Sequence, residues 1–320
     1  MTSRQWRRCS RCSLSFLANS GIGIDAAEQS ADVAWHAILV LMTGDNQHYL
    51  PAALIGGFGE RRPGLPLRKA RIVVRELSSG CIHTAAAEDV AFRPALYRLK
   101  NSTPGVDPDI VDKLWEMIEP ELRSLVERLS DGLLLADDAD RLIAYAAAAG
   151  IRHPTAFEAL AVGHQLRRGK QRPVGDQIQA MRVEAFLNEL KTMPAWRWRV
   201  LHSPDGCPRF VLSDRGWNLI QEPVLNALGY WLPLGPRVGI LAYSDDAKLP
   251  PRRAPFTEHR DLELSWVEWF NAIAWSDLTV THSVFAHPEQ EELLRKAPRP
   301  SGVANHPYVG GHSAAPTLFH

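Results

Sequence analysis

The hydrophobic positions in the middle of the chain recur at helical spacing. Between residues 110 and 129 apolar side chains return every three or four residues, which places them on one face of a helix: Ile110, Leu114, Trp115, Ile118, Leu122, Leu125, Val126 and Leu129. Asp107 and Pro108 stand where a cap and a first turn are expected. Pro120 removes a backbone donor inside this pattern, so we expect the helix to kink or to split in two.

Two more helices are predicted farther along. Residues 137–151 are rich in alanine and nearly uncharged after Arg141, which suits a helix that is buried among its neighbours. Residues 173–193 form the other helix, with apolar positions at Ile178, Met181, Phe186, Leu187 and Leu190.

Strand patterns flank this helical segment. Residues 71–77 have the β-branched enrichment of a short strand, and residues 95–101 are expected to form another. The alternating run 196–202, the turn residues after it and the apolar run 209–214 predict a β-hairpin. The remaining predictions are strand-like sequence over 230–244, a helix over 264–275 and a last strand over 278–286.

The order of these elements predicts the fold class. Helices occupy the middle and β-hairpins come late, in place of a regular alternation of strand and helix. We therefore expect a single α+β domain, over residues 42–295, in which a central helical segment packs with the late hairpins.

Both ends of the chain differ from this domain. Residues 1–41 have no clear period and change character at Met42, so we interpret them as an N-terminal extension and Met42 as the functional start. An intact N-terminus upstream of Met42, seen by mass spectrometry of the natural protein, would end that hypothesis. The Pro, Gly, Ser and His content of residues 296–320 predicts a disordered tail.

Charge and cysteine content narrow the class of protein. Lys+Arg and Asp+Glu both number 36, so no overall field favours nucleic acid or an anionic membrane. The longest apolar runs fall far short of the roughly 20 residues that span a bilayer. Four scattered cysteines fit a reducing cytoplasm better than a secreted disulfide framework.

Several residues are candidates for chemistry, and each also has a structural interpretation. His48 stands before an apolar segment, where a neutral imidazole acts as a general base or simply bonds to backbone. Asp112 and Glu119 are seven residues apart, which places them on one face of an unbroken helix. There they either bind a divalent ion such as Mg²⁺ or are only solvated. Arg152 is either an anion clamp or a cation at a helix C-terminus.

Two later segments have the same double interpretation. Ser213 and Asp214 close a predicted strand, as a ligand-binding pair or as an Asx-turn. The run WRWRVLH, residues 196–202, interleaves aromatic and basic residues, which suits single-stranded nucleic acid. Such alternation is more often one buried and one solvated strand face, so we do not expect nucleic acid as a partner.

Several short motifs follow one another along residues 42–286. They are His48-Tyr49-Leu50-Pro51, ALYRL at 95–99, Arg152-His153-Pro154, Ser213-Asp214, and Pro233-Leu234-Gly235-Pro236, with Asn271 before the last strand. In this order they resemble a bacterial family, domain of unknown function number 4238. One departure is that Arg215-Gly216 replaces the Asn-Pro that follows Ser-Asp in the family. The resemblance implies candidate positions and no reaction.

Taken together, these positions predict an intracellular hydrolase acting on a phosphate-containing or nucleotide-like substrate. His48 is then the acid or base, Arg152 the anion clamp, and Asp214 with Glu119 orient His48 or hold a divalent metal ion. Tyr49, Ser213 and Asn271 are the candidate substrate-binding residues. The alternative is a non-catalytic ligand-binding or interaction module whose motif residues are structural.

Overall fold

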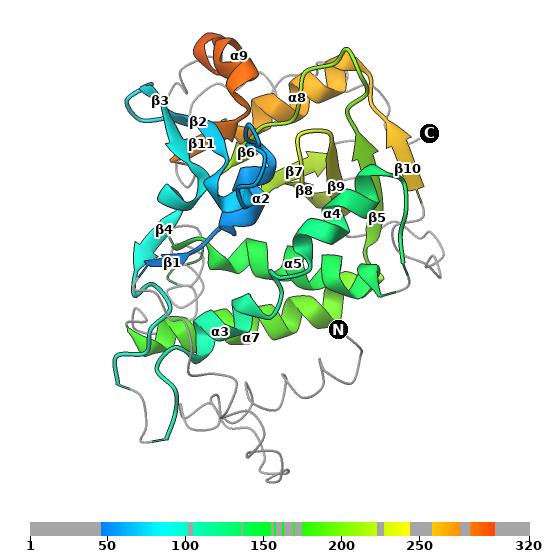
Figure 1. Ribbon diagram of the computed structural model, residues 1–320. Coiled ribbons are helices and arrows are strands. Elements are labelled where there is room, and N and C mark those ends of the chain that lie inside the picture. The colour runs from blue at the N-terminus through cyan, green and yellow to red at the C-terminus, as the bar shows by residue number, and fades with distance from the viewer. Residues whose placement is uncertain are drawn as a thin grey trace.

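The computed structural model describes residues 46–101, 105–135, 137–154, 157, 162, 169, 175–222, 227–243, 258–275 and 282–297. Residues 1–41, the proposed start at Met42 and nearly all of the tail 296–320 lie outside these ranges. Within them the chain folds into three sheets and a group of helices (Figure 1). This is the predicted α+β architecture.

The described helices are α2 (Ala52–Gly57), α3 (Ile110–Glu116), α4 (Leu122–Ser130), α5 (Asp138–Arg152), α7 (Asp176–Thr192), α8 (Leu264–Ala274) and α9 (Glu291–Lys296). The predicted helices α3, α4, α5, α7 and α8 follow the sequence periodicity, whereas the short helices α2 and α9 were not predicted. Short 3₁₀ turns lie at η1 (Leu67–Lys69), η2 (Ala87–Asp89), η3 (Met193–Ala195) and η4 (Pro288–Gln290). The expected split at Pro120 is confirmed, because α3 ends before it and α4 begins after it. α3 begins three residues later than Asp107, whose carboxylate accepts a bond from the Asp109 amide.

The largest sheet has five strands in the order β10-β5-β9-β8-β7. Its strands are β5 (Arg197–His202), β7 (Asn218–Glu222), β8 (Ala227–Pro233), β9 (Val238–Tyr243) and β10 (Glu258–Asp261). Neighbours are antiparallel except β10, which runs parallel to β5. β5, which contains most of the WRWRVLH run, lies inside this sheet between β9 and β10 and buries Trp198.

A second sheet joins the two ends of the described chain. It contains β2 (Arg71–Glu76), β3 (Ile82–Ala86), β6 (Leu212–Ser213) and β11 (Ser283–Ala286), in the order β3-β2-β11-β6. Phe285 of β11 pairs with Val74 on one side and with Leu212 on the other. The late strand β11 is therefore the link between early and middle parts of the sequence.

The hairpin predicted from residues 196–202 and 209–214 is wrong. β5 pairs with β9 and β10, whereas β6 pairs with β11. The segment between them bonds to the β8–β9 turn, where Arg237 Nη1 donates to the carbonyls of Pro204 at 2.7 Å and Cys207 at 2.8 Å. These contacts lie some thirty residues apart along the chain, so local turn composition did not indicate them.

The strand predicted over residues 95–101 is also wrong. β4 (Phe92–Pro94) pairs with β1 (Asn46–His48), and Ala95 then turns the chain with a positive φ of 48°. The Tyr97 amide donates to the Gln47 side chain at 2.6 Å instead of to a neighbouring strand. This loop fixes Tyr97 in the interior.

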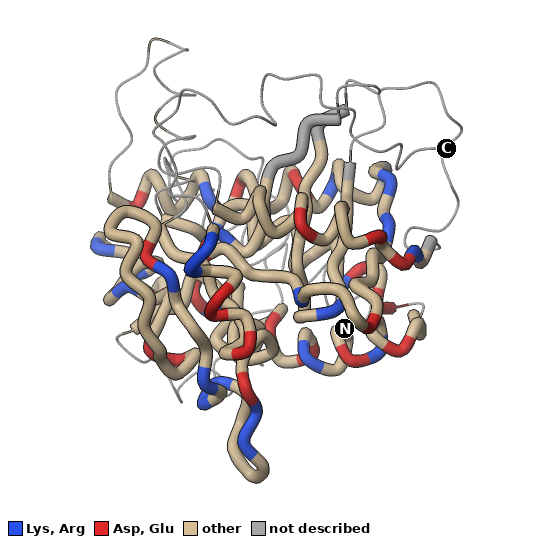
Figure 2. The backbone as a smooth tube through the Cα atoms, turned by 90° about the horizontal axis from the view of Figure 1, so that it is seen from above, with Lys and Arg blue, Asp and Glu red and all other residues tan. Residues whose placement is uncertain are grey.

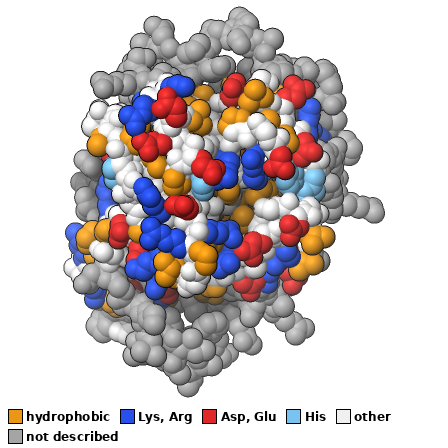
Figure 3. Space-filling model, turned by 45° about the horizontal axis from the view of Figure 1, so that its top comes forward, with side chains coloured by type: hydrophobic (Ala, Val, Ile, Leu, Met, Phe, Trp, Pro, Cys, Tyr) orange, Lys and Arg blue, Asp and Glu red, His pale blue; other side chains and the backbone are white. Residues whose placement is uncertain are grey.

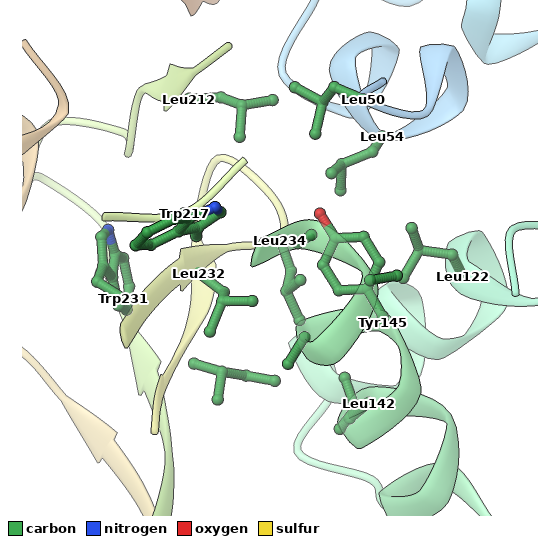
Figure 4. Close-up of a cluster of buried hydrophobic side chains, with 14 of the residues drawn as sticks. Leu50, Leu54, Leu122, Leu142, Tyr145, Leu212, Trp217, Trp231, Leu232 and Leu234 are labelled. Atoms are coloured by element: carbon green, nitrogen blue, oxygen red, sulfur yellow. The ribbon is translucent and has the colours of Figure 1, made fainter. Parts of the chain in front are cut away.

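Two hydrophobic clusters lie on opposite faces of the second sheet, because successive strand residues point to opposite sides. Phe285 belongs to the main cluster with α5, α7 and the large sheet, part of which is seen in Figure 4. Val284 and Ala286 belong to a smaller cluster with Trp275 and Leu294. No helix within the described ranges is long and apolar enough to cross a membrane.

Charged side chains are distributed without a dominant sign. Lys and Arg are interspersed with Asp and Glu along the backbone trace (Figure 2). They lie side by side on the face shown in Figure 3. This distribution agrees with the equal numbers of basic and acidic residues in the chain.

Candidate functional site

Three segments that are far apart in sequence meet around the Arg152 side chain. This residue ends α5 and is 3% exposed. Its Nη2 lies 2.6 Å from Glu119 Oε1 in the α3–α4 turn and donates to the His48 carbonyl at 2.6 Å. The guanidinium also lies over the Trp115 ring, 5.8 Å from its centroid. Arg152 thus joins β1, α3 and α5 through one side chain.

The backbone of Arg152 is held as firmly as its side chain. Its carbonyl accepts from the Tyr97 hydroxyl at 2.8 Å and from Arg182 Nη1 at 3.1 Å. Arg182 Nη1 also donates to the Ile151 carbonyl. These bonds satisfy carbonyls that a helix C-terminus leaves without intrahelical partners. Burial works to lower the pKa of Arg152, but the Glu119 carboxylate and the Tyr97 hydroxyl together outweigh it, so the pKa is raised and the charge is kept.

His48 is oriented by its neighbours and stays neutral. Its Nε2 lies 3.1 Å from the Glu88 carbonyl, which can only accept, so this nitrogen carries the proton. The ring packs against Phe92 with centroids 5.6 Å apart. Burial lowers the pKa of His48 below its usual value near 6.5, which favours the neutral imidazole.

Asp214 is paired with His153, a residue that the motif analysis included without assigning it a role. The Asp214 carboxylate lies 3.7 Å from His153 Nε2, and both side chains are 1% exposed. Both carboxylate oxygens also lie 3.2 Å from the His282 amide, at the entrance to β11. Burial lowers the pKa of His153, opposed by the nearby Asp214 carboxylate. The Tyr49 ring meets the His153 ring edge-on at 4.9 Å.

The turn after Asp214 depends on glycine. Gly216 has a φ of 76° and donates its amide to the Ser213 carbonyl at 2.9 Å. A Cβ at this position would lie 2.6 Å from a methyl of Leu50. Proline cannot adopt this φ, so Arg215-Gly216 makes a different turn from the Asn-Pro of the family pattern. Arg215 stacks on Trp217, with its guanidinium carbon 4.0 Å from the ring centroid.

The remaining candidates bond to backbone. Ser213 is fully buried, and its hydroxyl lies 3.5 Å from the Trp217 carbonyl. Asn271 of α8 accepts from the Val211 amide at 2.9 Å and donates to the Arg209 carbonyl at 3.0 Å. Asn271 therefore fixes the segment that leads into β6.

Asp112 and Glu119 do not share one unbroken helix. Asp112 lies in α3 and Glu119 in the turn that follows it. Burial raises the pKa of Asp112 to about 6, because the pull of Arg152 is offset by Glu116 and Glu119. Among the residues that the structure describes, no group of three His, Cys, Asp or Glu side chains is placed to hold a metal ion.

Comparison with known families identifies the chain. The model of the family "Protein of unknown function (DUF4238)" matches residues 46–277. The chain belongs to the DUF4238 family. The match includes every candidate residue from His48 to Asn271. Neither the curated proteins nor the solved structures contain a match.

The DUF4238 domain also contains a cleft that none of the candidate residues lines. Its volume is about 400 Å³, and it lies between α5, α7 and β8. The lining residues are Ala146, Ala147, Gly150, Ile151, Phe157, Met181, Glu184, Ala185, Asn188, Glu189, Met193, Trp217, Tyr230 and Leu232. Trp217 and Leu232 are seen side by side in Figure 4. Sequence periodicity missed this cleft because its small alanines have the pattern of a simply buried helix.

Proposed function

We propose that this DUF4238 protein is a non-catalytic small-molecule-binding protein whose motif residues are structural. The ligand site is the cleft between α5, α7 and β8. The observation that carries the proposal is that the candidate catalytic residues bond to one another or to backbone, while none of them lines the cleft.

Arg152 supports this assignment. An anion clamp must offer its guanidinium to the ligand, but Arg152 is buried and already bonded to Glu119 and the His48 carbonyl. A phosphate would have to displace the Glu119 carboxylate and leave it without its partner. Breaking a buried ion pair in this way is costly.

Unfolding free energies test the structural role of the motif residues. Asp214→Ala and His48→Ala should each lose more than about 2 kcal/mol, because buried polar partners are left unpaired. The matched controls are Asp205→Ala and His83→Ala, at exposed positions, which should stay within about 0.5 kcal/mol of wild type.

The opposite result would support the interpretation that the protein is an enzyme. If Asp214→Ala and His48→Ala are as stable as wild type or more stable, these residues are kept at a stability cost, as active-site groups often are.

Hydrolysis of a phosphate-containing or nucleotide-like substrate is the second candidate function. It is favoured by Asp112, whose pKa of about 6 suits a general acid, and by the neutral, half-buried His48, since the charge of Arg152 acts on both groups. A panel of phosphate esters and nucleotides, assayed with and without Mg²⁺, tests it. Turnover should increase as the pH falls toward 6 and be lost in Asp112→Asn. Equal rates in wild type and variant would reject this role for Asp112.

A cytoplasmic location is part of the proposal. It rests on the few, scattered cysteines and on the free thiols of Cys81 and Cys207.

A further inference from the structure

We propose that the cleft between α5, α7 and β8 binds a small organic cation, in which a protonated amine is attached to an apolar or aromatic body. This inference rests on the proposed binding function and names its ligand class. Three features of the lining carry it: a bare helix surface, an aromatic wall and two carboxylates.

The bare surface belongs to α5. Ala146, Ala147 and Gly150 leave the helix backbone open toward the cleft. A Cβ at Gly150 would meet nothing within 4 Å, and its φ is not positive, so packing does not require glycine there. Glycine inside a helix is less stabilising than alanine. Gly150 thus keeps space in the cleft for the body of a ligand, although it slightly destabilises the helix.

The aromatic wall is preorganised. Trp196 stacks on Tyr230 with centroids 5.3 Å apart, and Trp217 meets Tyr230 edge-on at 5.0 Å. The Trp217 Nε1 has no hydrogen-bond partner among the described residues although the side chain is only 6% exposed. Aromatic faces attract organic cations, and rigid walls lose little entropy on binding.

The charges select the sign of the ligand. Glu184 and Glu189 both line the cleft, and Asn188 between them adds an amide, whereas none of the lining residues that the structure describes is a Lys, Arg or His. Burial raises the pKa of the Glu189 carboxyl, because it disfavours the ionised form. An ammonium group bound beside Glu189 would stabilise its negative charge. Arg215 stacks on Trp217 without lining the cleft. A phosphate or carboxylate ligand would face two like charges.

The size of the cleft fits this class. About 400 Å³ lies within the usual range of small-molecule sites. An amine with one aromatic ring can place the ring between α5 and Leu232 while its nitrogen reaches the carboxylates of α7.

Three matched probes test the inference on the full-length protein by calorimetry and ligand-observed NMR. They are phenethylamine, the neutral 2-phenylethanol and the anionic phenylacetate, which share a ring and differ in charge. We expect phenethylamine to bind most tightly and Glu189→Gln to weaken it roughly tenfold, the loss of one charge-assisted contact. The affinity for 2-phenylethanol should not change in that variant.

A second pair of variants locates the site. Gly150→Leu fills the cleft and should abolish binding, whereas Gly57→Leu places the same side chain in open space on α2, away from the cleft, and should not. Unfolding curves of both variants confirm that they fold. If Gly150→Leu does not fold, Glu189→Gln and the comparison of probes still decide the outcome.

The outcomes separate the two proposals. Binding of 2-phenylethanol or phenylacetate that equals or exceeds that of phenethylamine, and is lost in Gly150→Leu, would overturn the cation inference and leave the binding function standing. No binding of any probe to wild type would overturn both.

Discussion

Arg152 brings a positive charge into the interior, and its ion pair with Glu119 sets how much stability is lost when Arg152 is replaced. Arg152→Met should lower the unfolding free energy by about 3 kcal/mol, the lower end for a broken buried pair, because Glu119 keeps some contact with water. Chemical denaturation measures this loss.

Arg123→Met is the matched control. Arg123 forms an ion pair with Glu127 at 2.9 Å, but both side chains are about half exposed. Such pairs contribute little, so the control should change by less than about 0.5 kcal/mol. Equal losses in the two variants would show that burial of Arg152 adds nothing to stability.

At the scale of residues, the sequence indicated the right region but not the right partners. Arg152, His48 and Glu119 do meet. Asp214, expected to orient His48, instead faces His153, which sequence reasoning treated only as part of a motif. Side-chain pairing depends on the path of the backbone between elements, and residue type alone does not encode it.

At the scale of elements, α3 contains a carboxylate that opposes folding when ionised. The pKa of Asp112 is about 6 in the folded protein against an ordinary value of 3.8. The folded state therefore binds the Asp112 proton more tightly than the unfolded state does. The stability that this proton contributes is lost as the pH rises through 6, and it returns as the pH falls toward 4.

Asp112→Asn should consequently be more stable than wild type at pH 8, by about 1–2 kcal/mol after allowance for its partial exposure. The difference should vanish near pH 3.5, where the wild-type carboxyl is protonated in both states. Urea denaturation at the two pH values measures it, with the fully exposed Asp205→Asn as a control. A less stable Asn variant at pH 8 would mean that the attraction of Arg152 outweighs burial.

At the scale of the whole molecule, periodicity predicted the longer helices and failed on the pairing of the strands. α5, α7 and α8 follow sequence patterns because helical contacts are local. The pairing partners of β5 and β6 come from later parts of the chain, and the residues within β5 and β6 do not indicate which strands these are. Two-residue β6 is also too short to specify its register by alternation.

The position of β11 predicts that the domain unfolds as one unit. Phe285 packs in the main cluster, whereas Val284 and Ala286 pack with Leu294 in the smaller one. Because the same strand serves both clusters, damage to the smaller cluster should weaken the main one.

Leu294→Ala tests this coupling, since the side chain is fully buried and its loss should cost about 2–5 kcal/mol. We expect a single denaturant transition at a lower midpoint with an unchanged slope, and reduced hydrogen-exchange protection in the distant β8–β9 hairpin. Leu65→Ala, at a position 53% exposed, is the control and should leave the denaturant midpoint and the hydrogen-exchange protection unchanged. An early transition confined to residues 283–297, with full protection retained in β8 and β9, would show instead that the C-terminal cluster unfolds by itself.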